Sequence, residues 1–148
     1  MPVLTYRSEL AAPPERVWAW IVSAAGIRRE LRPLVKMTMP RGLRNLDDVN
    51  VELGKPLFRS WLLLFGLLPF DFSDLTLLRL DPGRGFLEES PMMSMRRWRH
   101  ERWLEPTGAG TVLTDRLTFE PRFAGPLVTG FVRVLFAHRH RVLRRSLG

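Results

Sequence analysis

The first residues of the chain alternate between two sets of positions. One set, within residues 3–10, is Leu4, Tyr6, Ser8 and Leu10. The intervening positions are mostly polar. A period of two is typical of a strand with one buried face. The pattern therefore predicts a strand over residues 3–10 that buries this set.

Two short helices are predicted after this strand. Pro14 stands where a helix can begin, and apolar residues then recur at helical spacing up to Gly26, which we expect to end the helix. Residues 27–34 have the pattern of a second helix, which a proline closes. A short strand over 35–39 and an exposed polar loop over 40–48 follow.

The next segment is ambiguous. The apolar residues Val49, Val51 and Leu53 alternate with polar ones, which predicts a short strand. Residues 57–68 are apolar on both parities from Trp61 onward, so periodicity does not separate a strand buried on both faces from a helix. Their length, their leucine content and the proline that follows favour a short apolar helix.

Turn sequences punctuate the second half of the chain. Asp-Pro-Gly-Arg-Gly at 81–85 and Glu-Pro-Thr-Gly-Ala-Gly at 105–110 place glycine where hairpin loops need positive φ. The connections between the predicted strands are short enough to require antiparallel pairing. These strands are expected over 74–80, 85–90, 96–104 and 111–120. Together they predict a meander.

From Ala124 the apolar period changes from two to about 3.6, which predicts a long C-terminal helix. One polar gap, at His138 and Arg139, interrupts its apolar stripe. Both residues lie three or four positions from stripe residues on either side, so we expect them to face inward. The stripe is Leu127, Val128, Phe131, Val132, Leu135, Phe136, Val142 and Leu143.

The order of these elements predicts an α+β fold. One strand, two short helices, a run of antiparallel strands and one long helix are expected to form a single domain over residues 1–148. The sheet must cover the apolar stripe, so we expect a curved antiparallel sheet wrapped around the C-terminal helix. One helix does not fill the space inside such a sheet. The sequence thus also predicts an internal cavity lined by Trp, Phe, Leu and Met.

Three motifs in the chain are similar to those of a known superfamily. Ala-Pro-Pro-Glu-Arg-Val-Trp at 12–18 looks like an a-p-x-e-x-V-W start of a first helix, and the segment from Asp115 reads Asp-Arg-Leu-Thr-Phe-Glu-Pro before the last helix. Residues 135–143 are similar to an F-x-x-R-x-x-x-L ending. Over almost its whole length the chain resembles the SRPBCC superfamily, the helix-grip fold of START lipid-transfer domains, birch-pollen-allergen-like proteins and polyketide cyclases. The resemblance implies a helix-grip fold and a hydrophobic ligand pocket, and none of the motifs is catalytic.

Composition narrows the classes of function. The chain has no cysteine, which excludes disulfides, a thiol nucleophile and a thiolate metal site. Its net charge of +8 is nearly all arginine and favours anionic partners, although arginine excess also arises as composition bias. The start of the chain lacks the features of a signal peptide, and the apolar run at 61–70 is about half the length that spans a bilayer. We expect a cytoplasmic protein without stable membrane insertion.

Asp115 is the first candidate for a functional residue. It shares the inward parity of its strand with apolar residues, and a carboxylate in such surroundings needs a partner. The last helix and the strand over 96–104 supply the candidates. The expected polar cluster of the pocket is Asp115, His138, Arg139, His100 and Arg102. The expected apolar lining is Trp98, Phe119, Phe131, Leu135 and Trp61.

Two interpretations of this cluster stay open. In the functional one, an arginine binds a ligand carboxylate or enolate and a histidine moves protons. In the structural one, which is the more common, an internal salt bridge fixes the helix against the sheet. Glu88 and Glu89 lie on a neighbouring strand, and the pattern does not show which of them faces inward.

Other chemistries have little support in the sequence. His138 and His140 are two positions apart, which places their rings about 200° apart on a helix, so no metal site is expected. The glycine pairs are turns and not dinucleotide fingerprints, and no cofactor is predicted. Trp98 and Trp103 have opposite parities, which argues against a nucleic-acid surface. The basic tail is typical of a solvated helix end.

The leading hypothesis is a bacterial-type helix-grip domain that binds a hydrophobic small molecule, lipid-like or polyketide-like, in an internal cavity. The first alternative is a cyclase or dehydratase with a polyketide-like substrate, in which His100 or His138 is the acid/base. The second is a membrane-surface or protein-interaction module, because the basic tail and the apolar run at 61–70 could face lipid or a partner. A homodimer is also left open.

Overall fold

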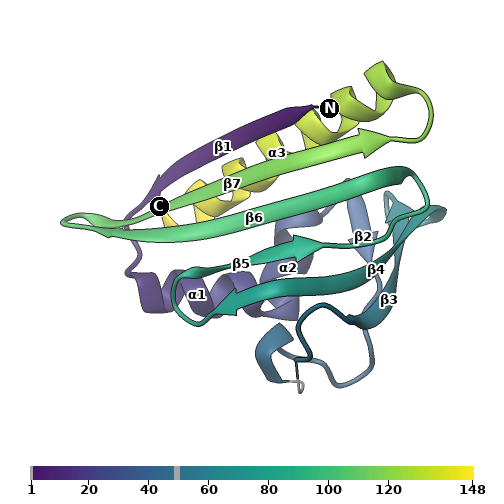
Figure 1. Cartoon of the computed structure of the whole chain (residues 1–148). Helices are drawn as coiled ribbons and strands as arrows, with labels where there is room; N and C mark the ends of the chain where they lie inside the picture. The colour runs from purple at the N-terminus through teal and green to yellow at the C-terminus, as the bar shows by residue number, and fades with distance from the viewer. Residues whose placement is uncertain (1, 49–50) are drawn as a thin grey trace.

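The computed structural model describes residues 2–48 and 51–148. In these ranges seven strands form one antiparallel sheet in the order β1-β7-β6-β5-β4-β3-β2 (Figure 1). The strands are β1 (Val3–Leu10), β2 (Val35–Met37), β3 (Pro56–Leu64), β4 (Leu68–Asp81), β5 (Gly85–Glu89), β6 (Met95–Thr107) and β7 (Gly110–Pro121). The helices are α1 (Pro14–Val22), α2 (Ala24–Leu31), a 3-10 turn (Leu46–Asp48) and α3 (Gly125–Leu147).

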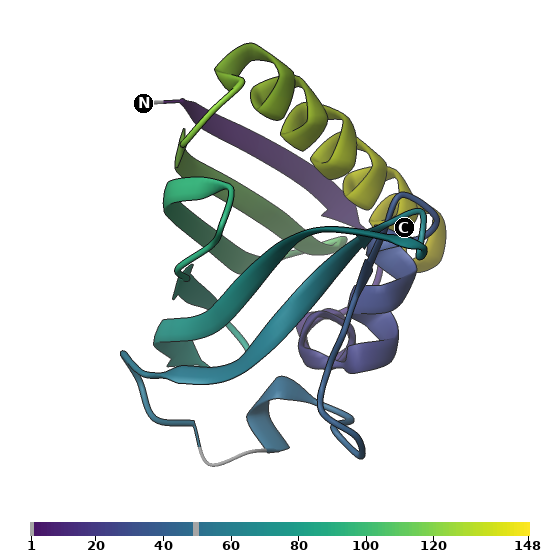
Figure 2. The same cartoon turned by 90° about the vertical axis from the view of Figure 1, so that its right-hand side faces the viewer.

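The sheet curls around α3. Figure 2 shows β1 and β7 running beside the helix, while β3 and β4 bend away on the other side of the interior. The helices α1 and α2 cover one end of this arrangement, and α2 packs against α3. This is the predicted α+β helix-grip fold. Among the described residues, no helix is long and apolar enough to cross a bilayer.

The first predicted strand and the four strands of the predicted meander are confirmed. β1 has the predicted bounds, and Leu4, Ser8 and Leu10 are buried as expected. β6 and β7 form a long hairpin in which Arg102 pairs directly with Asp115. Since β7 lies between β1 and β6 and under α3, its inward side chains are fully buried.

The two short helices exist, but their predicted boundary is wrong. Gly26 does not end α1; it lies in the first turn of α2. Ser23 separates the helices: its Oγ donates to the Trp20 carbonyl and accepts from the Gly26 N–H at 2.9 Å. A Cβ at Gly26 would overlap the Trp20 carbonyl oxygen, so the glycine permits a tight corner instead of a stop.

The helix predicted over 57–68 is wrong, because these residues form β3 and the turn into β4. Leu62 and Leu64 face the interior, whereas Trp61 lies on the outer face and packs its ring 5.6 Å from that of Phe72. The inward residues are apolar because they line the interior. The outward position 61 is apolar because its ring packs against a neighbouring ring on the outer face. Phe65 and the glycine after it have positive φ and make the turn.

The short strand predicted just before β3 is also wrong where it can be tested. Val51 and Leu53 are not in a strand, and Val49 lies outside the described residues. The strand predicted over 35–39 is shorter than expected, since β2 ends at Met37.

Candidate functional site

A pocket of about 440 Å³ lies between the sheet, α2 and α3. Its lining is almost entirely apolar. The helix α3 contributes Leu127, Val128, Phe131, Val132, Leu135 and Phe136, and the sheet contributes Leu62, Leu64, Phe70, Leu75, Leu77, Phe86, Met95 and Trp98. Polar side chains reach the lining in two groups. One is Glu88, His100, Arg102 and Arg139, and the other is Asp71, Ser73 and Ser94.

The first polar group is centred on an ion pair between β6 and β7. Arg102 donates from Nε to Asp115 Oδ1 at 2.7 Å and from Nη2 to Oδ2 at 2.8 Å. Both side chains are almost completely buried. The two residues are cross-strand neighbours, so the hairpin itself sets the geometry for a bidentate pair.

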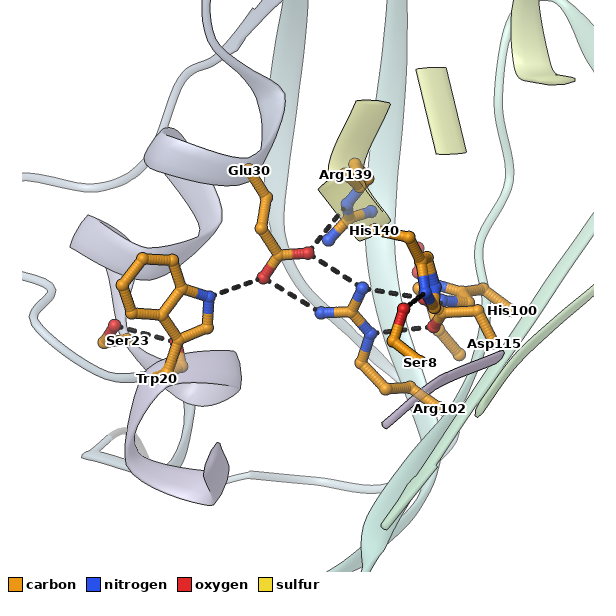
Figure 3. A network of polar contacts seen from close by, with 10 residues as sticks. Ser8, Trp20, Ser23, Glu30, His100, Arg102, Asp115, Arg139 and His140 are labelled. Carbon is orange, nitrogen blue, oxygen red and sulfur yellow. Dashed lines mark hydrogen bonds and ion pairs between the residues drawn. The ribbon is translucent and has the colours of Figure 1, made fainter. Parts of the chain in front are cut away.

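Glu30 joins this ion pair to the helices. It lies on α2 and accepts from Arg102 Nη1 at 3.1 Å and Nη2 at 2.8 Å, and from Arg139 Nε of α3 at 3.1 Å. Trp20 of α1 adds a fourth hydrogen bond, from Nε1 at 2.8 Å (Figure 3). One fully buried carboxylate therefore ties α1, α2, α3 and the sheet together.

Asp115 also accepts from two histidines. His100 Nε2 lies 2.6 Å from Oδ1, and His140 Nε2 lies 2.7 Å from Oδ2. Ser8 Oγ lies 2.7 Å from His140 Nδ1, which completes a Ser-His-Asp chain. Ser8 is buried between β1 and α3, does not line the pocket, and accepts from Arg144. This chain fastens α3 to β1 and offers no exposed nucleophile.

Burial and neighbouring charges shift the pKa values of the buried acids in opposite directions. Burial raises the pKa of Asp115, but Arg102 and His100 outweigh this and hold it well below its usual value. Burial likewise raises the pKa of Glu30, and Arg102 and Arg139 bring it below the usual value. Burial lowers the pKa of Arg102, yet Asp115 and Glu30 raise it overall.

Arg139 is the exception in this cluster. Burial lowers its pKa, and Glu30 does not restore it, because that carboxylate is shared with Arg102, which itself repels Arg139. Its guanidinium also packs 4.9 Å from the centre of the Phe136 ring. The charge of Arg139 is thus less well compensated than that of Arg102.

The second polar group contains a carboxylate, that of Asp71, which forms no ion pair with any residue in the described ranges. Asp71 accepts from the Phe72 N–H at 2.8 Å and the Ser94 N–H at 3.1 Å, and the Ser94 hydroxyl donates to its other oxygen. These bonds join β4 to the start of β6. Within residues 2–48 and 51–148, no three His, Asp or Glu side chains are placed to hold a metal ion.

Comparison with protein families assigns the chain to one of them. A family model described as a domain of unknown function (DUF8410) matches residues 8–147, nearly the whole chain. The chain belongs to the DUF8410 family. Comparison of this DUF8410 chain with curated proteins gives no match.

Solved structures share the fold of the DUF8410 chain. Protein CV1439 from Chromobacterium violaceum is 16% identical with a TM-score of 0.76, over 99% of this chain and 98% of CV1439. A START superfamily protein from Mycobacterium smegmatis is 13% identical with a TM-score of 0.65, over 98% of this chain and 96% of that protein. Ara h 8.0201 is 12% identical with a TM-score of 0.57, over 96% and 97% of the two chains. This likeness confirms the helix-grip fold that the SRPBCC motifs predict.

The structure brings together four of the five residues of the predicted polar cluster. Asp115, His100, Arg102 and Arg139 are all buried and joined by hydrogen bonds, and the last three line the pocket of the DUF8410 chain. The open question about the neighbouring acids is also answered. Glu88 is buried and lines the pocket, whereas Glu89 faces outward and pairs with arginines of β6.

The prediction that His138 faces this cluster is wrong. Its Nε2 donates to the Arg32 carbonyl at 2.6 Å, at the side of α3 next to the end of α2. His140 occupies the inward position instead. The buried residues of α3 recur as Val132, Phe136, Arg139, His140, Leu143 and Leu147, so the centre of the buried face is shifted from the predicted stripe.

Three of the five residues expected in the apolar lining are found at this pocket. Trp98, Phe131 and Leu135 line the pocket. Phe119 does not; it is fully buried, and its ring lies 5.9 Å from that of Trp98. Trp61 does not line it either, because it lies on the outer face of β3.

Glu30, Trp20 and Asp71 are site residues that the sequence analysis missed. Glu30 lies three positions after Ile27 on α2, so helical spacing could have placed it on the buried face. Asp71 had no such signal, because it lies in a strand that begins within the segment expected to be helical.

Proposed function

We propose that this DUF8410 protein binds a hydrophobic small molecule between the sheet and α3. The pocket of about 440 Å³ carries the proposal. Its volume falls in the range of about 300–1,000 Å³ that small-molecule sites occupy, and such sites combine an apolar lining with a few polar groups. The two polar groups described above have this character.

The resemblance to the SRPBCC superfamily supports the same function, since it implies a hydrophobic ligand in a helix-grip pocket. Three features of the chain agree with this. The lining is apolar on the side of α3 as well as on the sheet, the polar cluster lies at one end, and most of its groups already bond one another. A lipid-like or polyketide-like molecule fits this lining best.

Acid-base catalysis has weaker support. His138 is outside the pocket, and His100 gives its Nε2 to Asp115. Arg102 directs four of its five N–H donors to Glu30 and Asp115, which leaves at most one for an enolate. The arrangement therefore favours binding over a cyclase or dehydratase reaction.

The first experiment identifies what the pocket holds. The purified protein is analysed by native mass spectrometry and by organic extraction, and we expect a copurified apolar molecule. Displacement of N-phenylnaphthylamine, a neutral apolar dye, by the extracted molecule would then locate its binding to the same pocket.

A pair of variants on one helix tests the location directly. Val128 lines the pocket, whereas Val134 lies on the outer side of α3 and is 59% exposed. We expect V128W to abolish dye binding by filling the pocket, and V134W to leave it unchanged. Equal dye binding by V128W and the wild type, or no dye binding by the wild type, would contradict the proposal.

A further inference from the structure

One buried arginine has hydrogen-bond donors without acceptors. Arg139 donates from Nε to Glu30, and neither Nη1 nor Nη2 bonds any described residue. A guanidinium carries five N–H donors, so four of them on Arg139 have no partner among the residues that the structure describes. The residue is 9% exposed and lines the pocket.

The acids beside Arg139 do not serve these donors. Glu30 already accepts four hydrogen bonds, and Asp115 accepts two from Arg102 and one from each of two histidines. Each carboxylate has about four lone-pair positions, so both are saturated. The third acid at this end of the pocket is Glu88. It accepts a hydrogen bond from Ser90, which directly follows β5, and has no bond to Arg139.

The electrostatic position of Arg139 points the same way. Its pKa is lowered by burial and by Arg102, so its surroundings disfavour the charge that it carries. An additional anion beside Nη1 and Nη2 would offset this. A carboxylate suits the site because it accepts two parallel N–H donors from a guanidinium fork.

We propose that the ligand is an amphipathic carboxylate whose apolar body fills the pocket and whose carboxylate binds Nη1 and Nη2 of Arg139. The proposal rests on the proposed function and specifies its ligand class. The aliphatic body contacts the apolar lining, and the head group lies at the end where α3 meets α2.

The test compares three probes of equal chain length. Dodecanoate, dodecan-1-ol and methyl dodecanoate compete with N-phenylnaphthylamine for the wild-type protein at about pH 8, where the carboxylate is ionised. We expect dodecanoate to bind about 10-fold to 100-fold more tightly than the two neutral probes, the range of a hydrogen bond between charged groups. Equal binding of all three would overturn the carboxylate proposal and leave the proposed function intact.

Two variants assign the preference to Arg139. R139M should remove the preference for dodecanoate and leave dodecan-1-ol unchanged, while R141M, which changes an exposed arginine two positions further along α3, should keep it. A preference that survives in R139M would overturn the proposal. If R139M does not fold by circular dichroism, the wild-type comparison decides alone. If no probe displaces the dye, the carboxylate proposal and the proposed function both fail.

Discussion

Replacing Asp115 by asparagine tests the buried cluster most directly. The change keeps the shape of the side chain and removes its charge. Asp115 is fully buried and accepts from Arg102, His100 and His140. In D115N the amide NH₂ would face at least one of these donors, and Arg102 would retain Glu30 as its only carboxylate.

The size of the effect follows from this environment. Removing one partner of a buried ion pair costs about 3–5 kcal/mol, because the remaining charge is left uncompensated. For a chain of this length, 1 kcal/mol corresponds to about 2–4 °C in Tm. We therefore expect D115N to lower Tm by about 6–20 °C.

The assays are thermal unfolding, which gives Tm, and urea unfolding, both at pH 7 and both followed by circular dichroism and by tryptophan fluorescence. D74N is the matched control, since Asp74 also forms a two-bond pair with an arginine, Arg59, but on the solvent-exposed side of the sheet. Solvent screens that pair, so its loss should be much smaller. If D115N is no less stable than D74N, the cluster does not stabilise the fold as argued.

Two further predictions concern pH and a tight turn. Asp115 and Glu30 have pKa values below their usual ones, so their contribution is full above the unfolded values of about 4 and is lost as pH falls through the folded values. The free energy of unfolding should fall with acid more steeply in the wild type than in D115N, and parallel curves would refute this. A Cβ at Gly85, where φ is 153°, would overlap the Arg102 carbonyl oxygen, so G85A should cost about 1–3 kcal/mol in urea unfolding. G108A meets open space and serves as the control; an equal loss in both would contradict the steric reason.

The second half of the fold could be predicted because each strand there has one buried face and a glycine-containing turn. Alternation and turn chemistry then point to the same bounds, as in β6 and β7. β3 was not predicted as a strand because it lacks this alternation. Its inner face meets the pocket and its outer face carries Trp61 against Phe72, so no polar parity marks it as a strand.

The polar cluster was predicted from the one carboxylate on an apolar strand face. Asp115 required a partner, and its cross-strand neighbour Arg102 supplied one. The pattern of α3 did not fix which of its polar residues face the cluster, because an apolar stripe several residues wide does not define its own centre. The buried face of α3 includes Phe136, Arg139 and His140. The second inward polar residue is therefore His140 and not His138. Glu30 belongs to a separate helix, and only packing of α2 against α3 brings it near.

The four hydrogen bonds to Glu30 have a consequence for how a molecule reaches the interior. Swinging α2 away from α3 would separate this carboxylate from both arginines and expose a charge network that burial now holds together. Leu64, Phe70 and Leu127 also line the pocket, form no ion pair, and Leu127 is 76% exposed. We therefore expect a ligand to enter and leave the pocket between the β3–β4 turn and the first turn of α3, while the end at Glu30 stays closed.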